Sequence, residues 1–168
     1  MTDMALNPTP HPDEHAFLLQ RVQPALTGLI DGSLSTLAPI FAVALATHRP
    51  HYAFIAGLAT SFGAGLSMAY SEGLSDTGEL TGRGHPIVRG AITGLGTFLG
   101  GILHTLPFLI PHYHAALIAA LAVVCVELLT LALIRVRFFK VSFASSIASI
   151  TFGGAIIVAV SALLGSSG

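Results

Sequence analysis

Five long apolar segments, separated by short polar connections, constrain this chain more than any other feature. A helix needs about 20 apolar residues to cross a bilayer core of ~30 Å, and each segment has about that length. Only 9% of the residues are charged, whereas soluble domains carry about 25%. The sequence therefore predicts an all-α, polytopic membrane protein with five transmembrane helices. The predicted spans are Pro24–Thr47, Tyr52–Ser75, Val88–Ile110, Ala115–Ile134 and Val141–Leu164.

The residues before the first span lack this apolar character. Residues 1–20 contain several prolines and acids, without the basic and apolar regions of a signal peptide. We expect a short, partly disordered cytosolic N-terminal segment, with a helical turn at His15–Arg21. Residues 21–168 are expected to form one five-span domain, because the short connections leave no room for another.

The basic residues predict the orientation of the spans. Only Arg49 lies on the side opposite the N-terminus. Under the positive-inside rule the N-terminus is cytosolic and the C-terminus is outside. A formal net charge of −1 argues against a nucleic-acid partner, so membrane lipid is the expected surrounding. The basic residues on the N-terminal side are Arg21, Arg83, Arg89, Arg135, Arg137 and Lys140.

Three carboxylates, Asp31, Glu72 and Glu127, lie inside the predicted spans. A charge at mid-span costs about 2.5–3.5 kcal/mol on insertion scales, so such residues usually line a water-filled path or bind a cation. Alternatively, each acid is protonated or hydrogen-bonded within the bundle and has no transport role. Asp31 and Glu127 each lie about 10 Å from the cytosolic end of their span at 1.5 Å per residue, and Glu72 lies one turn nearer the cytosol. This clustering is typical of a cation site entered from the cytosol.

Met68 and Glu72 are four residues apart and share one helix face. A carboxylate with a thioether suits a borderline ion such as Fe²⁺ better than Mg²⁺ or Ca²⁺. The alternative for Met68 is gap-filling in a core. Ser67 and Ser71 are candidate path-lining hydroxyls, or they bond back to their own helix.

The first span carries a second polar stretch after Asp31. Pro39 has no N–H and is expected to kink the helix, which frees the carbonyl group near Ser35. Freed carbonyls and hydroxyls can line a polar pathway, so Ser35 and Pro39 are candidate path residues. An ordinary proline kink healed by Ser35 is the alternative.

The loop after the second span adds Asp76 and Glu79, which with Glu72 predict an acidic mouth that concentrates cations. A solvated acidic loop is the alternative. Arg83 and Arg89 are expected to pair with these acids or with lipid phosphates.

Proton transfer is a further expected role within the spans. Metal binding requires ionised carboxylates, so protonation of Asp31 or Glu72 would release an ion. His104, deep in the third span, is a candidate proton relay. The sequence shows no catalytic signature, so no enzymatic activity and no cofactor is expected.

Glycine pairs at small-xxx-small spacing, such as Gly28 with Gly32 and Gly90 with Gly94, predict close helix packing within the bundle or in a dimer. Five helices make a small bundle in which to enclose a polar path. A homodimer with a path at its two-fold interface is therefore the expected assembly.

Two motifs resemble those of a known family. The run from Asp31 to Pro39, Asp-Gly-Ser-Leu-Ser-Thr-Leu-Ala-Pro, is similar to the first-helix signature of vacuolar iron transporter-like proteins. The run from Gly65 to Glu72, Gly-Leu-Ser-Met-Ala-Tyr-Ser-Glu, is similar to their second-helix signature. The likeness is greatest to the membrane half of bacterial membrane-bound ferritin proteins, in which a rubrerythrin-like domain precedes the transporter domain.

The resemblance implies a dimer of five-helix protomers in a bacterial plasma membrane. It would export Fe²⁺, with Mn²⁺, Co²⁺ or Zn²⁺ as other candidate ions, in exchange for protons. By motif position Asp31 would be the first-helix translocation carboxylate, and Met68 and Glu72 would be the second-helix pair lining the path.

The chain departs from the family where metal is captured. The loop at residues 76–87 replaces the long metal-binding domain of plant members, and residues 1–20 are too short for a ferritin-like domain. Capture then falls to Asp76 and Glu79 or to a separate ferritin-like or metal-donating partner. The alternative function is a non-transporting membrane module that anchors or recruits an iron-storage partner.

Overall fold

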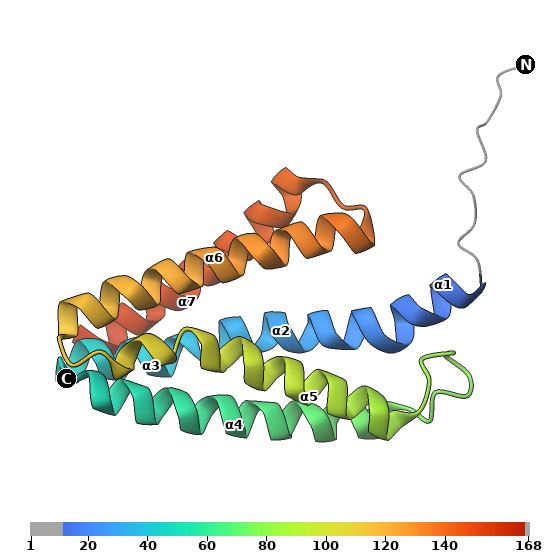
Figure 1. Ribbon diagram of the computed structural model, residues 1–168, viewed down its shortest axis with the longest axis horizontal. Helices are drawn as coiled ribbons and strands as arrows, with labels where there is room; N and C mark the ends of the chain where they lie inside the picture. The colour runs from blue at the N-terminus through green and yellow to red at the C-terminus, as the bar shows by residue number, and fades with distance from the viewer. Residues whose placement is uncertain (1–11, 167–168) are drawn as a thin grey trace, which may run out of the picture.

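The computed structural model describes residues 12–166 and contains helices and no strand over that range. Figure 1 shows the helices running back and forth along one long axis. Five helical segments of the described chain are long and apolar enough to span a membrane, so the fold is that of a multi-pass membrane protein. The elements are α1 (Pro12–Phe17), η1 (Leu18–Val22), α2 (Gln23–Ser35), α3 (Leu37–Thr47), α4 (Pro50–Ser75), α5 (Pro86–Leu103), η2 (Leu106–Leu109), α6 (Tyr113–Phe139) and α7 (Phe143–Ser166).

The first span begins earlier than predicted. Helix continues from Pro12 through a π-helical turn, η1, into α2, where only one turn before Pro24 was expected. Proline in the first turn and the acids that follow Pro12 favour a helix start there. In a regular α-helix Pro24 would clash with the carbonyl group four residues earlier. The wider π-helical turn η1 ends two residues before Pro24, at the place where this clash would occur. Residues 1–11 of the predicted leader lie outside the described residues.

The first span is interrupted at Thr36, as the position of Pro39 predicts. Helix α2 ends at Ser35, Thr36 has φ −87° and ψ −15°, and α3 starts at Leu37. Pro39 cannot donate to the carbonyl group of Ser35, so the hydrogen-bond ladder is broken there. The Thr36 hydroxyl donates to the Gly32 carbonyl oxygen at 2.8 Å, which satisfies one acceptor beside the break.

The third span differs from its predicted extent, Val88–Ile110. Helix α5 ends at Leu103, and a turn followed by the 3₁₀ helix η2 occupies the rest of the segment. Pro107 has no N–H for the carbonyl group of residue 103 and its ring opposes continued helix. As a result His104 caps a helix of 18 residues instead of lying within a longer one.

Glycine faces bring the first three spans into close contact. A Cβ atom placed on Gly28 would lie 2.1 Å from the Thr93 carbonyl oxygen, and one on Gly32 would lie 1.9 Å from that of Thr97. On the other side of α5, a Cβ atom on Gly94 would lie 2.6 Å from the Gly65 carbonyl oxygen. The predicted small-residue faces therefore pack helices together within one chain.

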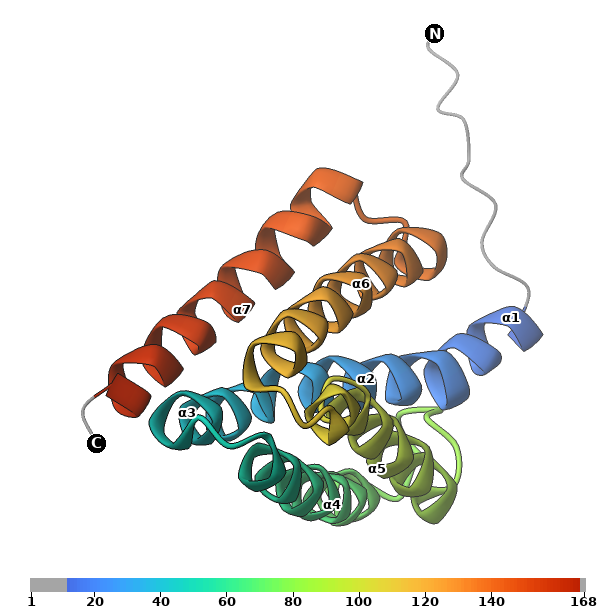
Figure 2. The same ribbon diagram turned by 60° about the vertical axis from the view of Figure 1, so that its left-hand side comes forward.

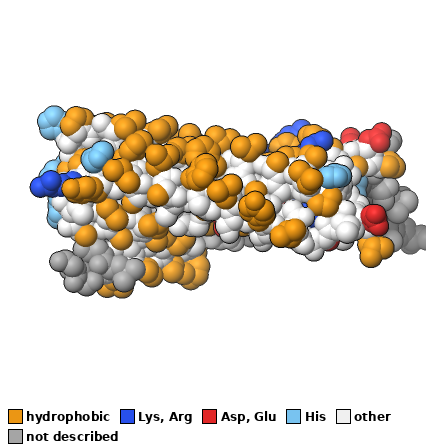
Figure 3. Space-filling model, turned by 90° about the horizontal axis from the view of Figure 1, so that it is seen from below, with side chains coloured by type: hydrophobic (Ala, Val, Ile, Leu, Met, Phe, Trp, Pro, Cys, Tyr) orange, Lys and Arg blue, Asp and Glu red, His pale blue; other side chains and the backbone are white. Residues whose placement is uncertain are grey.

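Helices α4 and α5 lie on one side of the rod formed by α2 and α3, and α6 and α7 lie on the other (Figure 2). The core between α3, α4 and α6 includes Leu37, Ile40, Phe41 and Phe108. On the face seen in Figure 3, hydrophobic side chains extend along the length of the molecule, and charged and histidine side chains lie toward its two ends. We call the end with Arg83 and Arg89 the arginine end and the opposite end, with Arg49 and several histidines, the histidine end.

Candidate functional site

The three buried or half-buried acids of the spans lie at two levels of the bundle. Contacts with α5 give the relative positions of Glu72 and Asp31 along the bundle. Arg89 contacts Glu72, and Thr97 packs beside Gly32, the neighbour of Asp31. These two α5 positions are about 12 Å apart at 1.5 Å per residue. Glu72 therefore lies at the arginine end, and Asp31 lies nearer the middle of the bundle.

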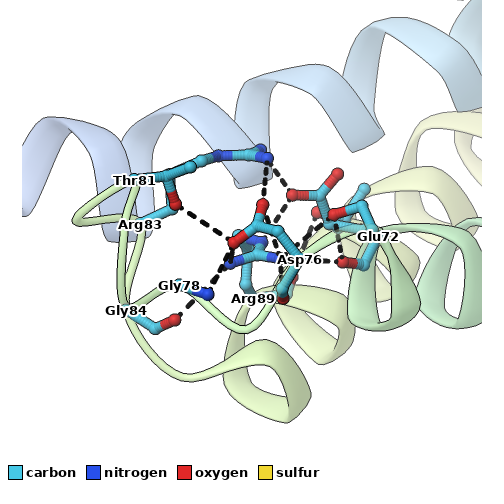
Figure 4. Close-up of polar contacts among 9 residues, drawn as sticks. Glu72, Asp76, Gly78, Thr81, Arg83, Gly84 and Arg89 are labelled. Atoms are coloured by element: carbon cyan, nitrogen blue, oxygen red, sulfur yellow. Dashed lines mark hydrogen bonds and ion pairs between the residues drawn. The ribbon is translucent and has the colours of Figure 1, made fainter.

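Glu72, three residues before the end of α4, is held by two arginines (Figure 4). Its Oε1 atom lies 2.5 Å from Arg83 Nη2 and 2.6 Å from Arg89 Nε. The contact with Arg83 is a hydrogen-bonded ion pair. The contact with Arg89 Nε is an ion pair without hydrogen-bond geometry.

Arg89 is the fixed member of this group, because its side chain is only 1% exposed. Its Nη2 atom donates to the carbonyl oxygens of Glu72 at 3.0 Å and Asp76 at 3.1 Å, and to Ser75 Oγ at 3.1 Å. The last carbonyl groups of a helix have no partner within the helix. Arg89 thus closes the end of α4 and joins it to α5.

Asp76 completes the group just beyond α4. Partial burial raises the pKa of Asp76, but hydrogen bonds from the Thr81 hydroxyl and the Gly78 amide and the charges of Arg89 and Arg83 outweigh it. The pKa of this carboxyl is therefore held below its ordinary value. The Gly78 N–H donates to Oδ1 at 2.6 Å and the Thr81 hydroxyl at 3.0 Å, and Arg83 Nη1 lies 3.2 Å from Oδ2.

We call Glu72, Asp76, Arg83 and Arg89 the arginine clamp. The sequence predicts an acidic mouth here, but two of its three acids are matched by two arginines. Glu79, the third, is exposed and has no hydrogen bond or ion pair with any described residue. The pairing of Arg83 and Arg89 with the acids was one of the two expected alternatives.

A second polar group lies in the middle of the bundle, where α2, α5 and α6 meet. Glu127 on α6 is 9% exposed and His104 is fully buried. Ser33 Oγ donates to Glu127 Oε1 at 3.1 Å, and His104 Nδ1 lies 2.9 Å from Glu127 Oε2. His104 Nε2 lies 2.9 Å from Thr36 Oγ1 at the break between α2 and α3.

The protons of the group follow from the donor assigned at Thr36. With its one hydroxyl hydrogen donated to Gly32, Thr36 accepts from the Nε2–H of His104. The bond between His104 Nδ1 and Glu127 then needs one proton, carried by the carboxyl or by the imidazole. In this arrangement Glu127 and His104 share one proton and form a pair without net charge. The sequence did not predict this pairing, because a separation of 23 residues gives no sign that the two side chains meet.

Asp31 has no such partner. Its side chain is half-buried and makes no hydrogen bond or ion pair with the rest of the described chain. Successive helix residues are about 100° apart, so Asp31 points away from Ser33 and Glu127. It lies on the face of α2 that also carries Thr27 and Ser35, both exposed. Thr27 was missed from sequence, although its four-residue spacing from Asp31 could have indicated it.

The remaining predicted residues do not gather around these acids. Met68 is half-buried on α4, between the levels of Glu72 and Asp31, and Ser67 and Ser71 are exposed. Pro39 is half-buried on α3. Over residues 12–166, no three His, Cys, Asp or Glu side chains are placed to hold a metal ion together. Asp31, Met68 and Glu72 are therefore not assembled into one site within a single chain.

A cavity of about 410 Å³ lies beside the shared-proton pair. Glu127 and Ser33 contribute to a lining that is otherwise almost entirely apolar, with Leu29, Leu103 and Val126 among its walls. Glu127 therefore borders a largely apolar space within the membrane-spanning region.

Comparison with known proteins adds no assignment to this geometry. No protein-family model matches the chain, and neither does any curated protein or solved structure.

Proposed function

We propose that this protein exports a divalent metal ion from the cytosol in exchange for protons, with Fe²⁺ as the first candidate ion and Mn²⁺ as the second. The observation that carries the proposal is the placement of Asp31. A carboxylate in a membrane span is costly unless it faces a partner, water or a cation, and Asp31 has no partner among the described residues. The motifs around Asp31 and Glu72, which resemble those of iron transporter-like proteins, support the same function.

The surroundings of Asp31 favour a path on the outer face of α2. Thr27, Asp31 and Ser35 are spaced four residues apart and line one face, and none of them is fully buried. Lipid does not solvate such a stripe, because hydrocarbon offers no hydrogen bonds. We infer that a second copy of the chain covers this face, and that the path runs between the two copies.

The path would begin at the arginine end, which the positive-inside rule favours as the cytosolic end. Glu72 and Asp76 would receive the ion there, and Met68 lies between their level and that of Asp31. Carboxylate and thioether ligands together suit Fe²⁺. Because a carboxylate must be ionised to bind metal, protonation of Asp31 would release the ion toward the histidine end.

Flux measurements in proteoliposomes test this function. The purified protein is reconstituted with a pH-sensitive dye inside, and Fe²⁺ is added under anaerobic conditions to reconstituted and protein-free vesicles. We expect protein-dependent metal flux with proton movement in the opposite direction. Flux without proton movement would contradict the exchange mechanism. Absence of flux from a folded preparation would contradict transport and favour a membrane module that recruits an iron-storage partner.

A further inference from the structure

The two arginines of the clamp contact the same two carboxylates but are held in different ways. Arg89 lies on α5, is 1% exposed, and bonds to backbone oxygens as well as to acids. Arg83 lies in the loop between α4 and α5, and its side chain is 25% exposed. The side-chain contacts of Arg83 within the described chain are those with Glu72 and Asp76. Arg89 is therefore part of the junction between α4 and α5, whereas Arg83 reaches the carboxylates from the loop and is partly exposed to solvent.

The loop that carries Arg83 turns at three glycines and is tied to Asp76 by the Gly78 amide and the Thr81 hydroxyl. Gly78, Gly82 and Gly84 have φ values of 81°, 66° and 75°, a region that other residues rarely adopt. The loop is linked to the N-terminal helical segment by one hydrogen bond, from Gln20 Nε2 to the Gly82 carbonyl oxygen at 3.1 Å. Because the backbone of the loop is tied to Asp76, rotation about the side-chain bonds of Arg83 is what would withdraw its guanidinium group and leave the rest of the clamp in place.

Withdrawal of Arg83 would change the charge presented to the solvent. Glu72 and Asp76 carry two negative charges, and the two arginines balance them. Without Arg83, Arg89 balances one charge, and a net charge of about −1 faces the arginine end. The side chain of Glu72, 15% exposed, would lose the group that covers it.

We propose that Arg83 determines cation specificity, by occupying Glu72 and Asp76 as an internal cation that an incoming metal ion must displace. The inference rests on the proposed function, because it concerns the carboxylates that would receive the ion. A divalent ion brings twice the charge of the guanidinium group to the same oxygens. Na⁺ and K⁺ bring no more charge than Arg83, and they lack its planar pair of donors, so they gain nothing by replacing it. The arginine thus admits divalent ions and excludes monovalent ones.

The test measures Mn²⁺ binding by electron paramagnetic resonance, on the protein in nanodiscs and without any transport. Arg83→Gln removes the competing charge, Arg83→Lys keeps it, and Arg21→Gln removes an exposed arginine that has no contact in the described residues. We expect Arg83→Gln to bind Mn²⁺ roughly tenfold more tightly than the wild type. Its binding should also become sensitive to K⁺, whereas Arg83→Lys and Arg21→Gln should resemble the wild type.

A double variant, Glu72→Gln with Arg83→Gln, locates the effect, because the gain in affinity should disappear with the carboxylate. Unchanged or weaker Mn²⁺ binding by a monodisperse Arg83→Gln protein would overturn the inference, as would a gain that survives in the double variant. The proposed function fails separately. Tighter binding in Arg83→Gln without flux in the wild type would uphold the role of Arg83 and contradict transport.

Discussion

The arginine clamp and the shared-proton pair each bury a carboxylate beside a basic side chain, but they are built on different principles. In the clamp, Glu72 meets arginines, which stay charged at any ordinary pH. In the pair, Glu127 meets His104, which can exist without charge. The clamp therefore holds its carboxylates by fixed charges, whereas the pair holds Glu127 by a hydrogen bond in which carboxyl and imidazole share one proton.

Asp31 provides the third case, because it has neither kind of partner in the described chain. The three acids occupy similar apolar stretches of the sequence, but they have different partners in the folded chain. Glu72 is paired with the arginines at the junction of α4 and α5, Glu127 joins α6 to α5 and α2, and Asp31 has no partner among the described residues.

Arg89→Gln should give the largest effect, because it removes the fixed cation and leaves two acids with one arginine. We expect a loss of about 3 kcal/mol or more in the free energy of unfolding, as for other broken buried ion pairs. Arg83→Gln, which removes a partly exposed partner of the same acids, should cost no more than about 1 kcal/mol. Unfolding in mixed detergent micelles measures both, and equal losses would contradict the distinction between the two arginines.

Gly32→Ala should come second, since its new Cβ atom would lie 1.9 Å from a backbone oxygen of α5 that cannot move aside alone. We expect a cost of about 2 kcal/mol as α2 and α5 separate. Gly63→Ala is the matched control, because no atom lies within 4 Å of its Cβ position, and it should stabilise α4 by about 0.5–1 kcal/mol. The same unfolding assay applies, and a tolerated Gly32→Ala would refute the close packing.

His104→Ala and Glu127→Gln separate the two ways of holding a carboxylate. Alanine leaves Glu127 with Ser33 alone and should cost about 1–2 kcal/mol. Glutamine can still accept from Ser33 and can donate its amide hydrogen to His104 Nδ1, so it should cost less than about 0.5 kcal/mol. Comparable losses for both variants in the unfolding assay would show that Glu127 is needed as a charge, against the shared-proton description.

The smallest effect concerns pH at the clamp. The pKa of Asp76 is lower in the folded protein than its ordinary value of 3.8. Its contribution to stability is therefore fully present above that value and is lost as the pH falls through the lower, folded-state pKa. The difference in thermal unfolding midpoint between the wild type and Asp76→Asn should be constant at higher pH and should shrink only in strong acid. A difference that shrinks between pH 5 and 7 would contradict this account, because no titration of Asp76 falls there.

Much of the fold follows from the sequence, because hydropathy and proline act locally. The five spans, the break near Pro39 and the glycine contacts of α5 depend on residue types at known spacings. The end of α5 at Leu103 was missed because an apolar run continues to Ile110, and hydropathy does not register that Pro107 stops a helix. The helical start at Pro12 was missed for the opposite reason, since prolines and acids suggested an irregular leader.

The site was less predictable, because its contacts join residues far apart in the chain. The clamp could be anticipated in outline, since Arg83 and Arg89 follow Glu72 and Asp76 closely. The pairing of His104 with Glu127 depends on where α5 ends and on the crossing of α5 and α6, neither of which has a sequence signature. The absence of a partner for Asp31 in the described residues is also a property of the folded chain alone.

Metal flux through an Asp31→Asn variant tests the central claim most directly. Asparagine keeps the size and polarity of the side chain but cannot ionise, and Glu14→Gln serves as the control because it removes an exposed acid outside the spans' polar groups. In proteoliposomes loaded with equal amounts of folded protein, we expect Fe²⁺ flux through Asp31→Asn to fall to the protein-free background while Glu14→Gln transports at the wild-type rate. Wild-type flux through Asp31→Asn would contradict the account, because the carboxylate on which it rests would then have no part in transport.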